Sequence, residues 1–373
     1  MLDRAKVLYQ LQQNTDRLFS HDTFSVDHVY AVWERIARDP LFATRVATAQ
    51  APWPLPMWQG QLNAYYELDQ HCQSYTALSV DGSQIYPDRH QGTHCWLVNI
   101  GSVAITYSEQ AGNVCVAGQP YVFVDDMYAG LPVVHDAVDC IRQEYECMVA
   151  TQCSLKYKSS PLIPQIVLLD GTLIFWQLEA KGCFYKEYFL PQYCFYLDIF
   201  AHNNTPIVGY ISAPRSKELV NLVRFAVFEG GMSQDDANNL VAHITDTMLL
   251  KRWLPPGART TVFASRSCIC AEYPEHLRPY FWYLHVGAEI ARVESCAWVA
   301  HNERLVDQIS TIILDQCNKG SGYPVVLAEA HEQAVVKSAD RDFFYHCIRM
   351  LSIEHNYHVQ QSQKSIKKLG LGI

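Results

Sequence analysis

The spacing of apolar residues changes near residue 74 of this 373-residue chain. Before that point, apolar residues recur at three- and four-residue intervals, which predicts helices over Ala5–Phe19 and Val26–Ile36. A proline-rich segment, Ala51–Pro56, follows and favours extended polyproline II geometry. We therefore expect an N-terminal helical arm over residues 1–70 and a main domain over residues 71–373.

After residue 74 the apolar residues form short runs of the kind found in β-strands. Ser74–Val80, Cys95–Ile100 and Val103–Tyr107 predict three strands, with a tight turn at Asn99–Ser102 between the last two. A helix is predicted over Val134–Thr151, because its apolar residues share one face. That face consists of Val134, Val138, Ile141, Tyr145, Met148 and Val149.

The run Ile166–Leu169 is apolar without alternation, which is typical of a strand buried on both faces of a sheet. Pro206–Ile211 predicts a further strand, and Ser216 is a suitable N-cap for the helix after it. This order of strands and helices favours an α/β fold with a ribonuclease H-like mixed sheet flanked by helices. Further strand-like segments are Thr261–Ala264, Phe281–Val286 and Arg292–Trp298, and two or three helices close the chain.

Two Asp-Gly pairs followed by a hydroxyl residue stand at the ends of apolar strands: Asp81-Gly82-Ser83 and Asp170-Gly171-Thr172. Carboxylates at the rim of an open α/β sheet lie where such folds bind ligands. Mg²⁺ and Mn²⁺ prefer carboxylate oxygens, so two such aspartates on neighbouring strands would suit divalent cations. Asp-Gly is also a common hairpin turn, and that interpretation stays open for each pair.

Composition narrows the class of protein. Hydrophobic residues make up 49% of the chain and no apolar stretch reaches 18 residues, so we expect a globular protein without a membrane span. The charged N-terminus is unlike a secretory signal, and the 13 cysteines form no CxxC pair, which favours reduced thiols and a cytoplasmic location. A net charge of −9 disfavours capture of nucleic acid over a broad surface, so a polyanion must enter a locally basic groove or be delivered by another protein.

A two-metal phosphodiesterase site needs ligands from several elements, with ions about 4 Å apart. The helix between the two Asp-Gly pairs offers Glu144 and Glu146, and a helical wheel places Glu144 nearer the core face. Near the C-terminus, Tyr323 and His331 lie eight residues apart, with Pro324 suited to the first helical turn and Tyr323 to the cap. Each glutamate could equally be a solvated helix carboxylate, and a single histidine on a helix is often a surface residue.

Together these segments resemble the NurA nuclease family over about residues 74–373 and in the same order. The stretches that carry the resemblance are Val80–Gln84, Leu169–Leu173, Gly209–Ser212 with Arg215–Ser216, and Tyr323 with His331. Weaker agreement comes from Thr245–Leu250 leading to Pro256–Thr260, and from Ile290–Trp298.

The resemblance implies a ribonuclease H-like fold and a Mn²⁺-dependent DNase, with Mg²⁺ as the other candidate ion. It further implies 5′→3′ exonuclease and single-strand endonuclease activity, and a homodimer that docks on a hexameric HerA-type ATPase in DNA end processing. Residue by residue, it assigns Asp81, Asp170 and a helix glutamate as metal ligands, completed by Tyr323 and His331. The family's Arg-x-x-x-Glu spacing selects Glu146, whereas the helical wheel selects Glu144, so we keep both with Glu144 slightly ahead.

Two basic residues and two other functions complete the expectations. Arg215 and Lys217, at the start of a helix, would suit a phosphate contact or be solvated loop charges. The chain could instead be a non-catalytic scaffold or regulatory subunit of the same fold that docks on an ATPase. A third reading is a ribonuclease H-like hydrolase that acts on RNA or on a structured junction.

Overall fold

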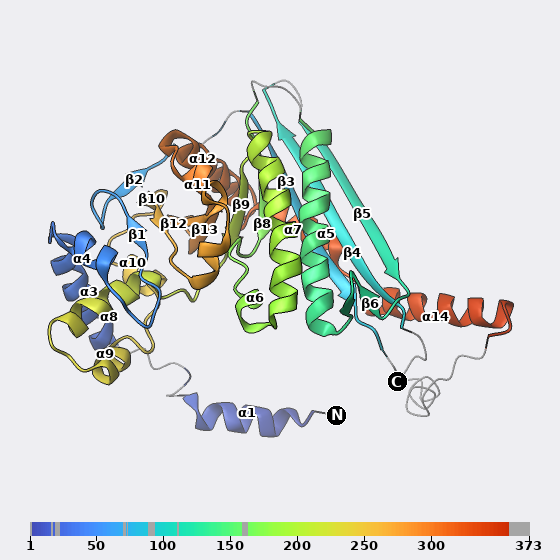
Figure 1. Ribbon diagram of the computed structural model, residues 1–373, viewed down its shortest axis with the longest axis horizontal. Coiled ribbons are helices and arrows are strands. Elements are labelled where there is room, and N and C mark those ends of the chain that lie inside the picture. Colours follow the sequence, from blue (N-terminus) through green and yellow to red (C-terminus); the bar gives the residue numbers. More distant parts are fainter. Residues whose placement is uncertain are drawn as a thin grey trace. The chain divides into compact units, whose positions relative to one another are not determined.

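Figure 1 shows a computed structural model of the chain, which describes residues 2–15, 18, 23–69, 72, 74–88, 94–109, 112–158 and 163–357. The chain divides into two compact units: Met1–Met57 with Arg215–Trp253, and Trp58–Pro214 with Leu254–Ile373. We call them the smaller and the larger unit. The sequence-based division at residue 70 differs from this one, because residues 215–253 join the N-terminal helices rather than the main domain.

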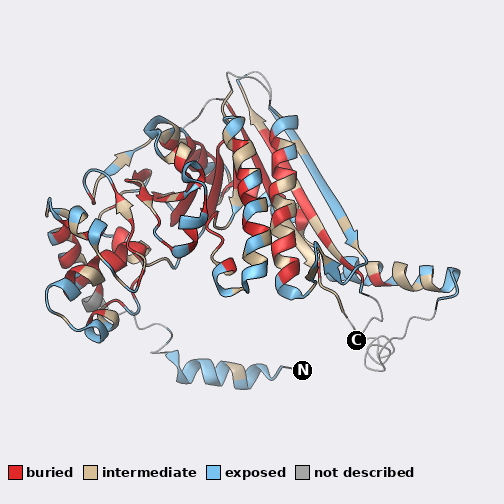
Figure 2. Cartoon of the chain, viewed as in Figure 1, coloured by how far each residue is buried: buried red, intermediate tan, exposed pale blue. Residues whose placement is uncertain are grey.

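The smaller unit is helical. Trp33 on α3 stacks on Trp253 with ring centroids 6.2 Å apart, and Asn221 of α8 donates from Nδ2 to the Pro54 carbonyl oxygen at 3.0 Å. The proline-rich segment therefore packs inside this unit. No residue of α1 is buried (Figure 2), and residues 16, 17 and 19 of the helix predicted over Ala5–Phe19 lie outside the described residues. The helices are α1 (Arg4–Gln13), α3 (Thr23–Ala37), α4 (Phe42–Thr48), α8 (Glu218–Glu229), α9 (Gln234–Leu240) and α10 (Asp246–Leu250).

A mixed sheet forms the larger unit, in the order β11-β12-β13-β9-β8-β3-β4-β5. Strands β3, β4 and β5 form an antiparallel meander, and β8 and β9 then add parallel to β3. A three-stranded meander followed by two parallel strands on its other side is the ribonuclease H-like arrangement, so the predicted fold class is confirmed. The strands are β1 (Met57–Trp58), β2 (Tyr65–Glu67), β3 (Tyr75–Ile85), β4 (Trp96–Tyr107), β5 (Asn113–Phe123), β6 (Met127–Tyr128), β7 (Leu131–Pro132), β8 (Gln165–Asp170), β9 (Ile207–Ile211), β10 (Ala258–Thr260), β11 (Phe263–Ala264), β12 (Pro279–His285) and β13 (Ile290–Cys296).

Helices cover both faces of this sheet. On one face, α5 and α7 lie side by side, and α5 packs on β3, whose Leu78 and Val80 belong to the core on this face (Figure 1). On the other face, α12 and α13 pack on Tyr75 and Ala77 of the same strand. Alternate residues of β3 thus face opposite cores, as the two-residue period of a strand requires. The helices and short 3-10 turns are α5 (His135–Lys156), α6 (Gln177–Ala180), α7 (Cys183–His202), η2 (Cys268–Glu272), η3 (Glu275–Leu277), α11 (Ala297–Ala300), α12 (Glu303–Lys319), α13 (Val325–Ala334) and α14 (Ser338–Glu354).

Two local predictions were wrong, one in the meander and one at the start of the helix after β9. The expected turn at Asn99–Ser102 does not form, because β4 runs unbroken from Trp96 to Tyr107, and the missing strand of the meander is β5. The helix expected from Ser216 has Lys217 as its N-cap, without a side-chain cap bond.

In the part of the chain that is described, no helix has both the length and the apolar character needed to cross a membrane.

The two Asp-Gly pairs have different structures. Asp81-Gly82 lies inside β3, where Asp81 pairs with Gly101 and Gly82 with Ile100, so the turn interpretation is wrong for this pair. Asp170 is the last residue of β8, and Gly171 has a φ of 125°, which only glycine adopts readily. The second pair is therefore a true turn at a strand end.

Candidate active site

Asp81 and Asp170 come from neighbouring strands. β3 and β8 are parallel, and Val80 is paired with Leu169 in their register. Asp81 and Asp170 are the next residues on the two strands, so they lie at the same end of the sheet. Burial raises the pKa of Asp170; the hydrogen bond from Tyr323 lowers it, and the negative charge of Asp81 raises it further. The two carboxylates are close enough to repel each other.

His331 reaches this pair from α13. Its Nδ1 lies 2.8 Å from Oδ2 of Asp81, and the Gly82 backbone N–H donates to Oδ1 at 2.8 Å. With the carboxylate as acceptor, the neutral imidazole that fits this contact has its proton on Nδ1 and an available lone pair on Nε2. This is the arrangement in which a carboxylate orients a histidine for metal binding or proton transfer.

A glycine brings α13 close enough for that contact. A Cβ at Gly101, the residue paired with Asp81, would meet the α13 backbone at Ala330 O (2.5 Å), at Gln333 C (2.7 Å) and at Ala334 N. Any side chain at position 101 would therefore push α13 off the sheet. The sequence had assigned Gly101 to a turn, although the alternation of Trp96, Val98 and Ile100 before it was a signal for a continuing strand.

Tyr323 lies on the other aspartate. Its hydroxyl donates to Asp170, and its ring packs edge-on against Tyr210 of β9 with centroids 5.7 Å apart. Burial, followed by the negative charge of Asp170, raises the pKa of Tyr323, so this side chain stays a neutral donor. Tyr323 precedes the N-cap, Pro324, instead of forming the cap as predicted.

Glu146 approaches the pair from α5 on the opposite face of the sheet. A Cβ at Gly82 would meet Glu146 Oε1 at 2.6 Å and Arg142 Cγ at 2.8 Å, so the absence of a side chain at Gly82 provides their space. Arg142, one turn before Glu146, forms an ion pair with it and donates to the Gly82 carbonyl oxygen at 3.3 Å. Arg142 is the arginine of the Arg-x-x-x-Glu spacing, and its separation of four residues from Glu146 is the spacing that brings two side chains together on a helix.

The structure places Glu144 elsewhere, which corrects the helical-wheel preference on geometry. Glu144 is 7% exposed and its Oε2 accepts a hydrogen bond from the Tyr128 hydroxyl at 3.2 Å. The wheel misled because α5 is buried against both the sheet and α7, so its buried arc is wider than one face. Glu146, and not Glu144, is the glutamate that interacts with Asp81 and Asp170.

Electrostatics at Glu146 are unusual. Burial raises its pKa to about 7; Arg142 lowers the pKa, whereas the charges of Asp81 and Asp170 raise it. Three acidic groups therefore converge on a single arginine and a histidine. No group of three or more His, Cys, Asp or Glu side chains among the described residues is already arranged to hold a metal ion.

The two predicted phosphate contacts belong to the smaller unit. Lys217 donates from Nζ to the carbonyl oxygens of Ala242 (2.5 Å) and Val241 (3.3 Å), which fixes its ammonium at the end of α9. Its role as a phosphate contact has no geometric support. Arg215 is exposed and stays a prediction.

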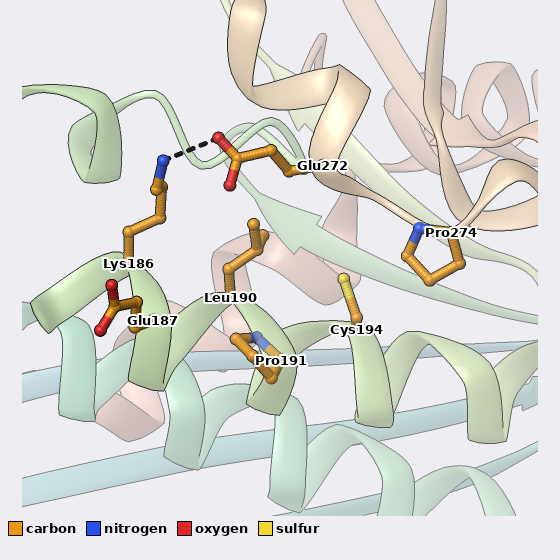
Figure 3. Close-up of a pocket in the computed structure, with 7 residues that line it drawn as sticks. All are labelled: Lys186, Glu187, Leu190, Pro191, Cys194, Glu272 and Pro274. Atoms are coloured by element: carbon orange, nitrogen blue, oxygen red, sulfur yellow. Dashed lines mark hydrogen bonds and ion pairs between the residues drawn. The ribbon is translucent and has the colours of Figure 1, made fainter. Parts of the chain in front are cut away.

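A separate hollow lies between α7 and the segment from η2 to η3 (Figure 3). It is wide open, and an ion pair between Lys186 and Glu272 at 2.7 Å crosses it. Burial raises the pKa of Cys194, which lines it, to about 12, so this thiol is a poor nucleophile. Asp81, Glu146 and Asp170 do not line this hollow.

Comparison with known proteins adds family information. The NurA domain matches residues 75–336, a span that contains every member of the acidic cluster. No curated protein matches the chain.

Solved structures with a similar arrangement include three described as NurA. One is 10% identical, covers 87% of this chain and 97% of that chain, and has a TM-score of 0.38. One described as bound to dAMP and manganese is 14% identical, covers 91% of this chain and 95% of that chain, and has a TM-score of 0.36. One described with manganese is 13% identical, covers 91% and 98%, and has a TM-score of 0.39.

Proposed function

The chain belongs to the NurA family, and family membership supports a nuclease-type function. We propose that it is a Mn²⁺-dependent DNA nuclease that hydrolyses phosphodiester bonds at the cluster of Asp81, Glu146, Asp170, Tyr323 and His331. The observation that carries this proposal is the convergence of Asp81, Glu146 and Asp170 from β3, α5 and β8 beside His331. Like-charged carboxylates held close together are unfavourable by themselves, and a cation offsets their repulsion.

The donor set suits a hard divalent cation. Oxygen ligands favour Mn²⁺ and Mg²⁺, and the Asp81 carboxylate behind His331 is a typical outer partner of a metal-bound imidazole. Asp81, Glu146, Asp170 and His331 would hold the ion, which when bound would supply Lewis-acid polarisation and an activated water. The NurA structures described with manganese support this choice of ion. Glu146 is engaged with Arg142 and must exchange this partner on binding, whereas a carboxylate has several lone pairs, so Asp81 can bind the ion and keep its contact with His331.

The chain's own residues then divide the remaining tasks. Asp81 orients the His331 ring, whose Nε2 lone pair either binds the ion or accepts and returns a proton, but not both at once. Tyr323 keeps Asp170 in place through its hydroxyl, and a neutral hydroxyl at this point can also donate to a phosphate oxygen. Arg142 offsets the charge of Glu146 when no cation is present.

The test is a cleavage assay with purified protein. Labelled single-stranded DNA, duplex DNA with free ends, and RNA would each be incubated with Mn²⁺, Mg²⁺ or EDTA. We expect cleavage of DNA with Mn²⁺, none with EDTA, and none by the Glu146→Gln variant, whereas the Glu144→Gln variant should remain active. Cleavage of RNA in preference to DNA would favour the hydrolase that acts on RNA.

The finer features of the family are part of this proposal. We include 5′→3′ digestion of ends, single-strand endonuclease activity, a homodimer and docking on a hexameric HerA-type ATPase. A net charge of −9 supports the need for a partner, because the chain has little long-range attraction for DNA. Products from strands labelled at either end reveal the polarity.

The second candidate function is a non-catalytic scaffold or regulatory subunit of the same fold that docks on an ATPase. A protein that binds the ATPase but shows no Mn²⁺ binding and no cleavage would establish that alternative.

A further inference from the structure

The turn after Asp170 is built against the neighbouring strands. Gly171 donates from its backbone N–H to the Tyr210 carbonyl oxygen at 2.9 Å. A Cβ at Gly209 would meet the Gly171 carbonyl oxygen at 2.5 Å, so the turn crosses β9 where the strand lacks a side chain. The backbone on the far side of Asp170 therefore has a defined path.

The buried carboxylate of Glu294 holds this turn by hydrogen bonds. Glu294 of β13 pairs with Gly209 in the sheet and has no solvent exposure. Its Oε2 accepts two hydrogen bonds from the turn, one from the Thr172 hydroxyl at 2.6 Å and one from the Leu173 backbone N–H at 2.9 Å. The missing side chain at Gly209 thus gives room to the turn, which the carboxylate of the neighbouring Glu294 holds by two hydrogen bonds.

The charge of Glu294 is balanced within the sheet. Its Oε1 accepts from Nε of Arg292 at 2.7 Å, and the Arg292 guanidinium lies 3.7 Å from the ring centroid of Phe281. Burying such an ion pair has a desolvation cost that often equals its electrostatic gain, so hydrophobic residues would stabilise the sheet about as well. A buried pair that also anchors a turn provides geometric precision instead.

We propose that Glu294 is a positioning residue that holds Asp170 through Thr172 and Leu173 of the following turn. The proposal rests on the proposed nuclease function. Thr172 transmits the constraint, because its oxygen also accepts from the Ile174 backbone N–H at 2.9 Å and so fixes the turn on both sides. Without this anchor, Asp170 would keep its strand but lose its fixed direction at the strand end.

The decisive variant is Thr172→Val, which removes the hydroxyl but nearly keeps the side-chain shape. We expect Mn²⁺ affinity, measured by calorimetry on the full chain, and kcat to fall roughly 10- to 100-fold, with little change in KM for DNA. Thr172→Ser restores the hydroxyl and should restore both quantities. Glu294→Gln should lower Mn²⁺ affinity and kcat in the same way. If the Glu294→Gln variant does not fold, Thr172→Val alone tests the positioning role.

Ser295→Ala is the matched control. Ser295 is buried beside Glu294 on β13, but its hydroxyl donates to the Ile207 carbonyl oxygen at 2.7 Å and does not touch the turn. It should lower the melting temperature without changing Mn²⁺ affinity. If Thr172→Val loses only thermal stability while wild-type protein binds Mn²⁺ and cleaves DNA, the positioning role is wrong. If wild-type protein does neither, the proposed function fails first, and the positioning role fails with it.

Discussion

His331 Nδ1 and Asp81 Oδ2 lie 2.8 Å apart although 250 positions separate them in the chain. Their contact depends on Gly101, which lets α13 approach the strand beside Asp81. The Val326 backbone N–H at the start of α13 also donates to Gln316 of α12 at 3.1 Å, which fixes that end of the helix. The histidine is thus placed by packing at both ends of α13.

Removing either partner of this contact should abolish cleavage. Asp81→Asn keeps the shape but loses the charge that orients His331, and His331→Ala loses the imidazole; we expect a rate loss of at least about 100-fold for each. Rates on labelled single-stranded DNA and thermal unfolding by circular dichroism would be measured together. Glu332→Gln, at the exposed neighbour of His331, is the control and should cleave at the wild-type rate. Full activity in the Asp81→Asn variant would contradict the proposed site.

The two glutamates of α5 should respond in opposite ways. Glu146→Gln removes the carboxylate that interacts with Asp81 and Asp170, so we expect cleavage to fall by orders of magnitude. Glu144→Gln changes only a group bonded to Tyr128, so its effect should be on stability alone. Cleavage rate and melting temperature for both variants decide this. Loss of activity only in Glu144→Gln would reinstate the helical-wheel choice.

Glu146 should destabilise the metal-free protein at neutral and alkaline pH. Its pKa rises from 4.5 to about 7 on folding, so the folded state favours the protonated acid and loses stability as pH rises across that interval. Glu146→Gln cannot ionise; in EDTA its melting temperature should exceed that of wild type by several degrees above about pH 7, and the difference should shrink towards pH 4.5. Mn²⁺ should stabilise the wild type more than the variant. Equal melting temperatures across this pH range would refute the argument.

A side chain at position 101 should move α13, and His331 with it, away from Asp81. In the Gly101→Ala variant the new Cβ would collide with the α13 backbone, so we expect a loss of stability of about 1–3 kcal/mol and loss of cleavage. Gly182→Ala is the control, because a Cβ there meets nothing within 4 Å. Chemical denaturation and cleavage rates would be compared for the two variants. Wild-type activity in Gly101→Ala would show that α13 does not need this close approach.

The proposed assembly predicts a dimer whose digestion of duplex ends is accelerated by an ATPase. β5 is an edge strand with exposed apolar residues at Val114, Val116 and Val122, a surface that a second copy of the chain would cover. Light scattering should give twice the chain mass, and Val116→Lys should reduce it to that of one chain. With a HerA-type hexamer and ATP, duplex ends should be digested faster than by the isolated protein, and a non-hydrolysable nucleotide is the control. A monomer that degrades duplex ends efficiently alone would contradict this prediction.

The sequence by itself determined the fold class and named four of the candidate site residues. Apolar periodicity gave the helix α5 and the central strand β8, because buried elements need apolar residues at fixed local intervals. The short motifs identified Asp81, Asp170, Tyr323 and His331, and the structure brings these four residues together. Local patterns contain this information because a residue's type and its place on a strand or helix are local properties.

Only the tertiary structure decided which glutamate joins them. Glu144 and Glu146 differ by two positions on one helix, and the choice depends on whether α5 is covered by one neighbour or by two. The roles of Gly82, Gly101 and Gly209 were likewise invisible, because each is defined by a backbone or side chain from a distant segment that occupies the place of a Cβ. The same holds for Glu294, whose hydrogen bonds reach residues more than 120 positions away. Contacts of this kind follow from how helices and strands pack on one another, and no local period records them.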